Sequence, residues 1–446
     1  MNSFLLLLIA YAIVGTLIAL YARKFGIRDD ADYFIAGRNV SGLISALTYA
    51  ATTYSAFMMV GLVGLSYATG VGAQAFELFY LVGTLMLLSY YAPKLWKLSR
   101  DVNAVSPAEL LGHRFGKETA VAVSIICLIA LIPYTSVQLI GVSLILEKLS
   151  GIDYLIAVVI SAVLVSLWAL IGGLRGVAWT DAVQGVIMLT AAFVAIFYVF
   201  NMNPSFFEDA PMLGELLVVP NRMWTPLKFI SLTVPWFFFA LTNPQVLQRT
   251  FIPRDGKALK RMVVYFGIFG LIYTVIVTLL GLLLKVMTIK GIFPAIQDRD
   301  MVTPTLLSLM PSHLSLLVTL SIFAAAITTA NSIILSLSSM VARDIAKGKR
   351  FVGQISIVIL TVFVALFALM RPSYIVELSV MSSTLLLSIL PLLFATFHTN
   401  YTKGLEAVTI AFAVAVLLNY LKNPLTPVIT LIVGMVVLIA RNKLCC

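Results

Sequence analysis

Two groups of neutral hydroxyl side chains lie in apolar segments, where they could bind a small cation. Thr328 and Thr329 are adjacent within the stretch 317–334, which contains no charged residue. Thr52, Thr53 and Ser55 interrupt a second uncharged stretch, 43–65. Paired hydroxyls and backbone carbonyls released from a broken helix form a dehydrated site of neutral oxygens. Such a site suits a small hard cation, and sodium fits that description.

The composition indicates that the solvent of this chain is a lipid bilayer. The 446 residues are 61% hydrophobic and 11% charged, whereas about a quarter of the residues of soluble domains are charged. Apolar runs of about 20 residues, the length that spans a bilayer, recur from end to end. We therefore expect residues 1–446 to form one all-α transmembrane domain. The thirteen expected spans are 3–22, 42–68, 73–97, 119–149, 154–173, 177–201, 227–249, 262–289, 312–345, 351–370, 374–397, 404–421 and 424–441.

The distribution of basic residues predicts the orientation of these spans. If the N-terminus lies outside, the inner loops, with Arg249 counted among their residues, hold 22 of the 30 Lys and Arg residues. Short cytoplasmic loops carry such an excess, so we expect the C-terminus to be cytoplasmic in a multi-pass plasma membrane protein. The net charge of +11 then reflects orientation in the bilayer. A nucleic-acid partner is not expected.

Two of the expected spans contain residues that interrupt helices. The second span has small and hydroxyl residues at its middle, 50–55, and the seventh contains Pro235 and Pro244. Each proline removes a hydrogen-bond donor, and the freed carbonyls need partners in protein or in a water-filled cavity. Asn243 and Gln245 beside the second proline favour a cavity. Close helix packing at 50–55 and a simple proline kink remain alternatives.

The positions of the interrupted helices suggest an internal repeat. The blocks 42–201 and 227–397 each contain five expected spans, and each block begins with an interrupted helix. Because five is odd, the second block starts in the opposite orientation to the first. This is the pattern of inverted repeats around a site at the membrane midplane. The span 3–22 precedes the repeats, and the two spans in 404–441 follow them.

Three segments resemble a known transporter family. Residues 172–185, GGLRGVAWTDAVQG, resemble the signature segment of the sodium:solute symporter family. Asp32–Arg38 resembles the family's motif before the second helix, and Ala324–Thr329 resembles its ninth helix. The resemblance implies a LeuT-type fold of five plus five inverted helices. It also implies secondary active symport with a co-transported sodium ion.

The resemblance assigns possible ion-binding positions. In the family, carbonyls of the unwound second helix and hydroxyls of the ninth helix bind sodium, which here implies Ala51, Tyr54, Ala325, Thr328 and Thr329. The alternative is that both hydroxyls bond back to their own helix.

Asp181 matches the acidic residue of the signature segment. It could line a sodium exit route or, with Asn331 and Ser332, form a second sodium site. It could also be a charge at a helix N-terminus, where the helix dipole favours a carboxylate.

The sequence signals for the solute site are less specific than those for the ion site. Glu77 matches an acid that contacts substrate in sugar-transporting relatives, although it could be a membrane-edge carboxylate or a structural hydrogen-bonding group. The spacing of Trp236 and Pro244 resembles the proline-transporting branch, and Asn243-Pro244 also resembles the pantothenate-type relatives. The expected wall is formed by Thr53, Ser55, Ala56, Phe57, Glu77, Trp236, Phe239, Ala240 and Asn243.

The expected wall contains no Lys or Arg. A substrate carboxylate would therefore rest on exposed N–H groups or helix N-termini. We expect a small organic solute, with proline or another small amino or carboxylic acid favoured over a sugar.

Other functions remain possible alternatives at this stage. The same fold could couple to protons through Asp181 or Glu77, and a membrane sensor derived from a transporter is a remote possibility. An enzyme is not expected, because His113, His313 and His398 lie at loop edges without metal-ligand spacing. The sequence predicts no oligomeric state.

Overall fold

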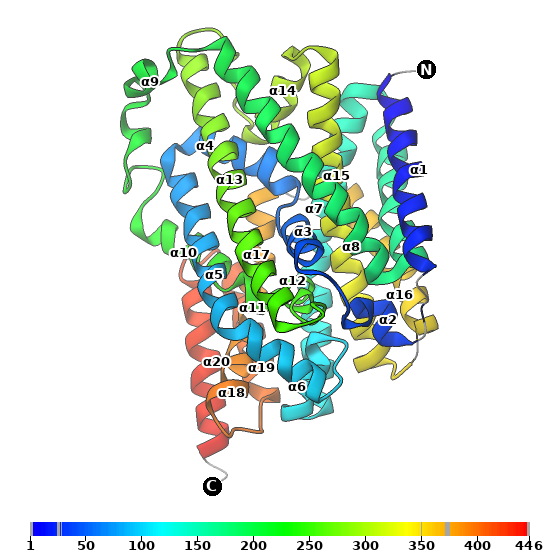
Figure 1. Ribbon diagram of the computed structural model, residues 1–446. Coiled ribbons are helices and arrows are strands. Elements are labelled where there is room, and N and C mark those ends of the chain that lie inside the picture. Colours follow the sequence, from blue (N-terminus) through cyan, green and yellow to red (C-terminus); the bar gives the residue numbers. More distant parts are fainter. Residues whose placement is uncertain (1–2, 25–26, 28, 349, 371–374, 444–446) are drawn as a thin grey trace.

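The computed structural model describes residues 3–24, 27, 29–348, 350–370 and 375–443, and these form a bundle of helices (Figure 1). Arg28, Lys349 and Arg371, which contribute to the predicted charge distribution, lie outside the described residues. The helices of the N-terminal half are α1 (Ser3–Arg23), α2 (Asp30–Ile35), η1 (Ala36–Arg38), α3 (Gly42–Thr53), η2 (Phe57–Leu62), α4 (Val63–Thr69), α5 (Val71–Asp101), α6 (Pro107–Phe115), α7 (Lys117–Ser150), α8 (Tyr154–Met202), α9 (Phe206–Asp209) and η3 (Ala210–Leu217). Those of the C-terminal half are α10 (Pro226–Phe237), α11 (Phe239–Thr242), α12 (Pro244–Arg249), α13 (Gly256–Ile289), η4 (Arg299–Met301), α14 (Val302–Leu309), α15 (Ser312–Met340), η5 (Val341–Ile345), α16 (Arg350–Leu369), α17 (Ile375–Leu386), η6 (Leu387–Ile389), α18 (Leu390–His398), α19 (Leu405–Tyr420) and α20 (Thr426–Lys443).

The number of membrane crossings depends on how the broken helices are counted. Within the described residues, nine helices are long and apolar enough to cross a bilayer, and the bent pair formed by α3 and η2–α4 makes ten. Dividing α8 at Gly173 and adding α10–α12 and the 16-residue α19 gives the predicted thirteen. The predicted limits agree with these segments to within about two residues at most ends. The main difference is α13, which begins at Gly256 instead of 262.

Helix α8 reverses direction at Gly173. A straight helix of its 49 residues would be roughly 74 Å long, far more than the 30 Å of a bilayer core. Gly173 has φ +54° and ψ −154°, a conformation that is essentially restricted to glycine. Residues on both sides of it reach Tyr11 of α1: the Trp168 ring lies 5.3 Å away, and Gln184 donates a hydrogen bond to the tyrosine hydroxyl. The two legs of α8 therefore lie together along α1, at one edge of the bundle in Figure 1.

Helix α3 is interrupted where the sequence predicts it. The chain leaves the helix at Tyr54, whose φ of −89° and ψ of 91° are not helical. It resumes in the π-helical turn η2, and the two halves meet at an angle of 53°. The side-chain oxygen of Ser55 accepts a hydrogen bond from the backbone N–H of Phe57 at 3.1 Å. This contact caps the start of the second half.

The expected seventh span is divided into α10, α11 and α12. Asn243 lies between the last two with φ −88° and ψ 111°, and Pro244 follows at the first position of α12. Proline is favoured at this position because its missing N–H would have no helical partner there. The proline thus ends one helix and starts the next instead of bending a continuous one.

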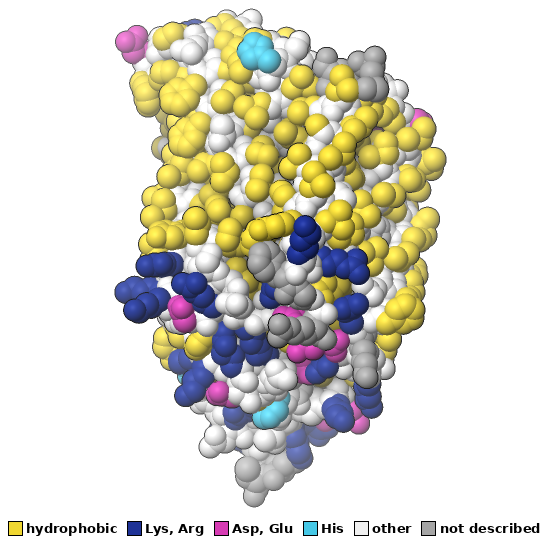
Figure 2. Space-filling view, turned by 45° about the vertical axis from the view of Figure 1, so that its right-hand side comes forward, with side chains coloured by type: hydrophobic (Ala, Val, Ile, Leu, Met, Phe, Trp, Pro, Cys, Tyr) yellow, Lys and Arg dark blue, Asp and Glu magenta, His cyan; other side chains and the backbone are white. Residues whose placement is uncertain are grey.

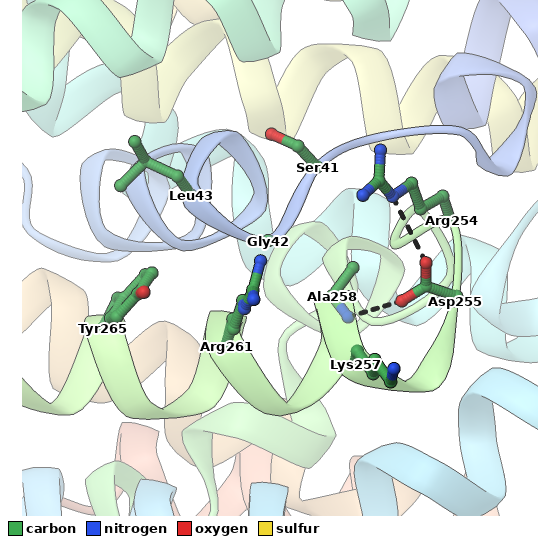
Figure 3. A pocket seen from close by; sticks show the side chains of 9 residues that line it. All are labelled: Ser41, Gly42, Leu43, Arg254, Asp255, Lys257, Ala258, Arg261 and Tyr265. Atoms are coloured by element: carbon green, nitrogen blue, oxygen red, sulfur yellow. Dashed lines mark hydrogen bonds and ion pairs between the residues drawn. The ribbon is translucent and has the colours of Figure 1, made fainter.

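Charged side chains gather at the end of the bundle that holds the C-terminus. Figure 2 shows Lys and Arg side chains below a broad apolar band. A surface cavity at this end lies between the start of α3 and the start of α13, where Arg254, Lys257 and Arg261 are found (Figure 3). Asp255 caps α13 by accepting the N–H of Ala258 at 2.7 Å, a bond that also lowers the pKa of its carboxyl group. The cap fixes the point at which α13 enters the bundle beside α3.

Candidate ion and solute site

The broken helix α3 lies directly against α15. The hydroxyl of Thr328 is 2.8 Å from the carbonyl oxygen of Ala51 and 2.9 Å from that of Ala325. The hydroxyl of Thr329 is 3.3 Å from the same Ala51 oxygen and 3.2 Å from the carbonyl oxygen of Thr52. Both threonines are fully buried. The structure thus brings five neutral oxygens from two helices to one point.

The contacts of Thr328 and Thr329 bear on the alternative that both hydroxyls bond back to their own helix. Thr328 bonds partly to its own helix through Ala325, but both contacts of Thr329 cross to α3. The Thr52 carbonyl is an addition to the predicted set. It belongs to the last turn of α3, where carbonyls lack intrahelical partners, and this rule could have identified it from the sequence. Tyr54 lies at the break as predicted, and its ring points away to stack on Phe266 at 5.8 Å.

A buried network of charged and hydroxyl side chains adjoins this group of oxygens. Asp181 and Arg249 are both fully buried, and the guanidinium Nη2 lies 3.7 Å from the carboxylate. Thr48 donates to Asp181 at 2.6 Å and accepts from Arg249 Nε at 3.1 Å. Nη2 of Arg249 also donates to the Ser332 hydroxyl at 2.5 Å, and that hydroxyl is 2.9 Å from the hydroxyl of Thr52. A continuous chain of contacts therefore links the ion pair to the hydroxyl cluster.

The assignment of Arg249 to an inner loop is wrong. It is the last residue of α12, and its side chain is completely enclosed. The physical reason is Asp181, because a carboxylate buried in this environment requires a positive partner. The sequence signal was available: an acid expected inside the membrane needed a partner, and Arg249 is the last residue of an expected span.

The possible second ion position is only partly assembled. Asp181 and Ser332 lie in the same network, but Arg249 contacts both of them. Asn331 is fully buried, and neither atom of its amide has a hydrogen-bond partner among the described residues. A second cation bound here would share the Asp181 carboxylate with the guanidinium.

The residues of the expected solute wall are buried near the two breaks. Trp236 packs edge-on against Phe57 at 5.4 Å and against Phe239 at 5.0 Å, which joins the two broken helices. Ala56, Ala240 and Asn243 are fully buried, and Thr53 is nearly so. Within the described part of the chain, Oγ1 of Thr53 and Oδ1 of Asn243 have no hydrogen-bond partner. The hydroxyl of Ser55, in contrast, accepts the backbone N–H of Phe57.

Glu77 is buried inside the bundle. It lies in α5 with a residue exposure of 2%, and its Oε2 atom has no hydrogen-bond partner among the described residues. The structural hydrogen bond considered for Glu77 is therefore not formed by this oxygen.

The side chains of the site also restrict the type of ion. Within the described residues, no group of three or more His, Cys, Asp or Glu side chains could hold a metal. Transition metals in proteins select such ligands. Neutral carbonyl and hydroxyl oxygens are instead the ligands of an alkali ion that exchanges its water shell for protein oxygens.

Comparison with known proteins agrees with this architecture. The chain matches the sodium:solute symporter family over residues 33–433. It is 26% identical over 361 residues to the sodium/pantothenate symporter of Haemophilus influenzae, which covers 76% of this chain and 73% of the relative.

Solved structures share the fold. A Na⁺-coupled sialic acid symporter in a substrate-bound outward-open state superposes with a TM-score of 0.83 at 20% identity, covering 97% of this chain and 96% of that one. A nucleobase-cation-symport-1 family transporter with bound bromovinylhydantoin gives a TM-score of 0.59 at 12% identity, covering 93% and 94%. The LeuT-type fold is thereby confirmed. Because the family match extends over most of its length, the chain belongs to the sodium:solute symporter family.

Proposed function

We propose that sodium binds between α3 and α15, at the carbonyls of Ala51, Tyr54 and Ala325 and the hydroxyls of Thr328 and Thr329. Family membership makes the chain a sodium-coupled solute symporter, a transporter and not an enzyme. The observation that supports this location is the set of contacts from both hydroxyls to the carbonyls at the end of α3. Each hydroxyl has a single proton, so its lone pairs can face an ion when that proton turns aside.

The proposed ion position explains how sodium would act on the solute site. Two of the proposed carbonyls, those of Ala51 and Tyr54, lie at the end of α3 and at its break, and Thr53 lies between these two residues in the chain. An ion held by both helices would fix this turn against α15 and so order the wall that the solute meets. Solute binding against α10–α11 would then permit the bundle to close, and the inner side would open next. Alternating access of this type fits a site at the junction of broken helices.

The driving force is sufficient for such coupling. A membrane potential of 100 mV supplies about 2.3 kcal/mol for each sodium charge that moves inward. For a solute without net charge, this corresponds at equilibrium to more than a tenfold solute gradient, even before the sodium concentration gradient is counted. One tightly coupled sodium ion is therefore enough for concentrative uptake of a zwitterion such as proline.

The proposed solute is a small amino or carboxylic acid, which would contact Thr53, Ser55, Ala56, Phe57, Glu77, Trp236, Phe239, Ala240 and Asn243. The apolar and aromatic character of most of these side chains disfavours a sugar, which needs many polar partners. Proline is the leading candidate, and the pantothenate transported by the relative is a second.

The proposed arrangement in the membrane follows the charge distribution. We place the N-terminus outside and the end rich in Lys and Arg, where the C-terminus lies in Figure 1, in the cytoplasm. The division into repeats at 42–201 and 227–397 remains part of this proposal, supported by the interrupted helix that begins each block. In this arrangement the apolar band contacts the lipid bilayer.

Proton coupling is the second candidate, because Asp181 and Glu77 are buried carboxylates. Uptake of radiolabelled proline and of radiolabelled pantothenate into proteoliposomes separates the two candidates. We expect an inward sodium gradient at equal pH to drive accumulation, and an inward proton gradient in sodium-free buffer to drive none. Accumulation driven by the proton gradient alone, with no response to sodium, would assign the coupling to a carboxylate instead.

A further inference from the structure

Glu77 is a buried carboxylate that the proposed ion site does not use. It lies in α5 with a residue exposure of 2%, and within the described residues no Lys or Arg forms an ion pair with it. Its Oε2 atom has no hydrogen-bond partner there. Asp181, the other deeply buried acid discussed above, is paired with Arg249 and Thr48. An acid in a membrane interior is costly without a partner, so the unpaired oxygen of Glu77 requires an explanation.

Aromatic rings are concentrated around the position of Glu77. On the same helix, Phe76 and Tyr80 lie 6.2 Å and 6.0 Å from the ring of Trp236. Phe57 and Phe239 approach the same indole at 5.4 Å and 5.0 Å. We call these five rings the aromatic cluster. It joins α5 to both broken helices and therefore lies within the proposed solute wall.

The position of the carboxylate relative to the cluster follows from the helix. Glu77 is adjacent to Phe76 and three residues before Tyr80, and residues three apart share a helix face. At a residue exposure of 2%, the Glu77 side chain therefore lies in the protein interior and does not face lipid.

Together these features have the chemistry of a site for an organic cation. The faces of Trp, Tyr and Phe rings attract ammonium groups, with Trp the strongest. A carboxylate without a protein partner supplies the countercharge, and the proposed solute wall contains no Lys or Arg to compete. A carboxylate-only solute would instead bring a second negative charge close to Glu77, which is unfavourable at low dielectric.

We propose that the transported solute carries a positively charged nitrogen that binds Glu77 and packs against the aromatic cluster. The solute class is thus a small amine, a secondary or quaternary ammonium, or a zwitterion that contains one. This inference rests on the proposed solute site and narrows it, because it favours amino acids and betaines over simple carboxylic acids. The aromatic rings pack on one another, so binding of a solute among them requires them to separate.

Pairs of ligands with equal shape and different charge test this proposal. Glycine betaine and tert-butylacetate differ only by nitrogen in place of carbon, and proline and cyclopentanecarboxylate form a similar pair. Binding to the purified full-length protein in saturating sodium is measured by thermal shift and isothermal titration. We expect at least one ammonium compound to bind at least tenfold more tightly than its carbon counterpart. Pantothenate, whose only charge is a carboxylate, should bind more weakly than that compound.

The variant Glu77→Gln keeps the size of the side chain and removes its charge. We expect it to abolish the preference for the ammonium member of each pair, while sodium still stabilises the variant and so shows that it is folded. Glu118→Gln, at an exposed position at the start of α7, is the matched control and should retain the preference.

Several results would overturn the inference. These are equal or tighter binding of the carbon counterparts, binding of pantothenate but of no ammonium compound, no binding by any ammonium compound, or an unchanged preference in Glu77→Gln. Repeating the titrations without sodium separates this inference from sodium coupling. Ammonium-selective binding that is indifferent to sodium would leave the inference standing and count against the proposed coupling.

Discussion

At the scale of single residues, a buried ion pair and a hydroxyl cluster form one connected unit. Arg249 reaches Ser332, which contacts the Thr52 hydroxyl, and the Thr52 carbonyl accepts from Thr329. These three contacts link the guanidinium of Arg249 to the proposed ion position. The hydroxyl pair was predictable, because hydroxyls in an uncharged apolar stretch are visible in a sequence. The need for a positive partner of Asp181 was also visible, but the pairing with Arg249 itself depends on how α8 and α12 both pack against α3.

The ion pair leads to a prediction about stability. Removing one member of a fully buried pair leaves an uncompensated charge and costs about 3–5 kcal/mol, whereas replacing both is far less harmful. We expect Asp181→Asn and Arg249→Met each to lower the melting temperature of the purified protein markedly. The double variant Asp181→Asn with Arg249→Met should recover most of the loss, as measured by thermal unfolding in one detergent.

The control for this cycle is an ion pair at the surface. Asp255→Asn removes the contact with Arg254 at 3.2 Å, where both side chains are more than half exposed, and should have a small effect. Strictly additive losses in the Asp181 and Arg249 variants would show that the two charges do not compensate each other.

At the scale of elements, three interruptions of helices shape the molecule. The break of α3 at Tyr54 and the gap between α11 and α12 at Asn243 were predictable, because small residues mark the first and Pro244 marks the second. Pro235, the other proline expected to interrupt this span, lies inside α10. The reversal at Gly173 falls on the last residue of the predicted span 154–173, directly before the predicted gap. The π-helical turn η2 was not predictable, since its residues are apolar and its geometry is determined by what packs around it.

The reversal at Gly173 gives a second prediction. A methyl group at this position would lie 2.5 Å from the backbone oxygen of Tyr33, and its φ of +54° is already strained for any other residue. We expect Gly173→Ala to prevent accumulation of folded protein, because the reversal itself costs about 1–3 kcal/mol for alanine before the clash is counted. Size-exclusion chromatography of a fluorescent fusion measures the folded fraction.

Gly151 is the matched control, with φ +69° and no atom within 4 Å of an added methyl group. Gly151→Ala adds only the strain of the left-handed conformation, about 1–2 kcal/mol, and should remain mostly folded. Equal yields of folded protein from the two variants would mean that the close approach of Gly173 to Tyr33 is unimportant.

At the scale of the whole molecule, the sequence predicted an all-α membrane protein because apolar runs, prolines and charge distribution are all local signals, while the LeuT-type fold was implied by the resemblance to the family. The helix count and most helix ends follow from them, and the fold is confirmed by the solved structures that it resembles. The solute site was less predictable, because its features arise only when α5 and the two broken helices meet. The unpartnered Oε2 of Glu77, on the helix that contributes Phe76 and Tyr80 to the aromatic cluster, is such a feature.

The central claim is that a dehydrated sodium ion is held between α3 and α15. The most direct test is the effect of sodium on the thermal stability of Thr328→Ala with Thr329→Ala, with potassium chloride at equal ionic strength as reference. A ligand at one hundred times its dissociation constant stabilises the state that binds it by about 2.7 kcal/mol. The control is Thr361→Ala, whose hydroxyl is buried in α16 and donates only to Ile357 of its own helix among the described residues.

We predict that sodium raises the melting temperature of the unmodified protein and of the Thr361→Ala control, and that it leaves the double variant unchanged. If sodium stabilises the double variant as strongly as the unmodified protein, the ion binds elsewhere and the proposed coupling between α3 and α15 is wrong.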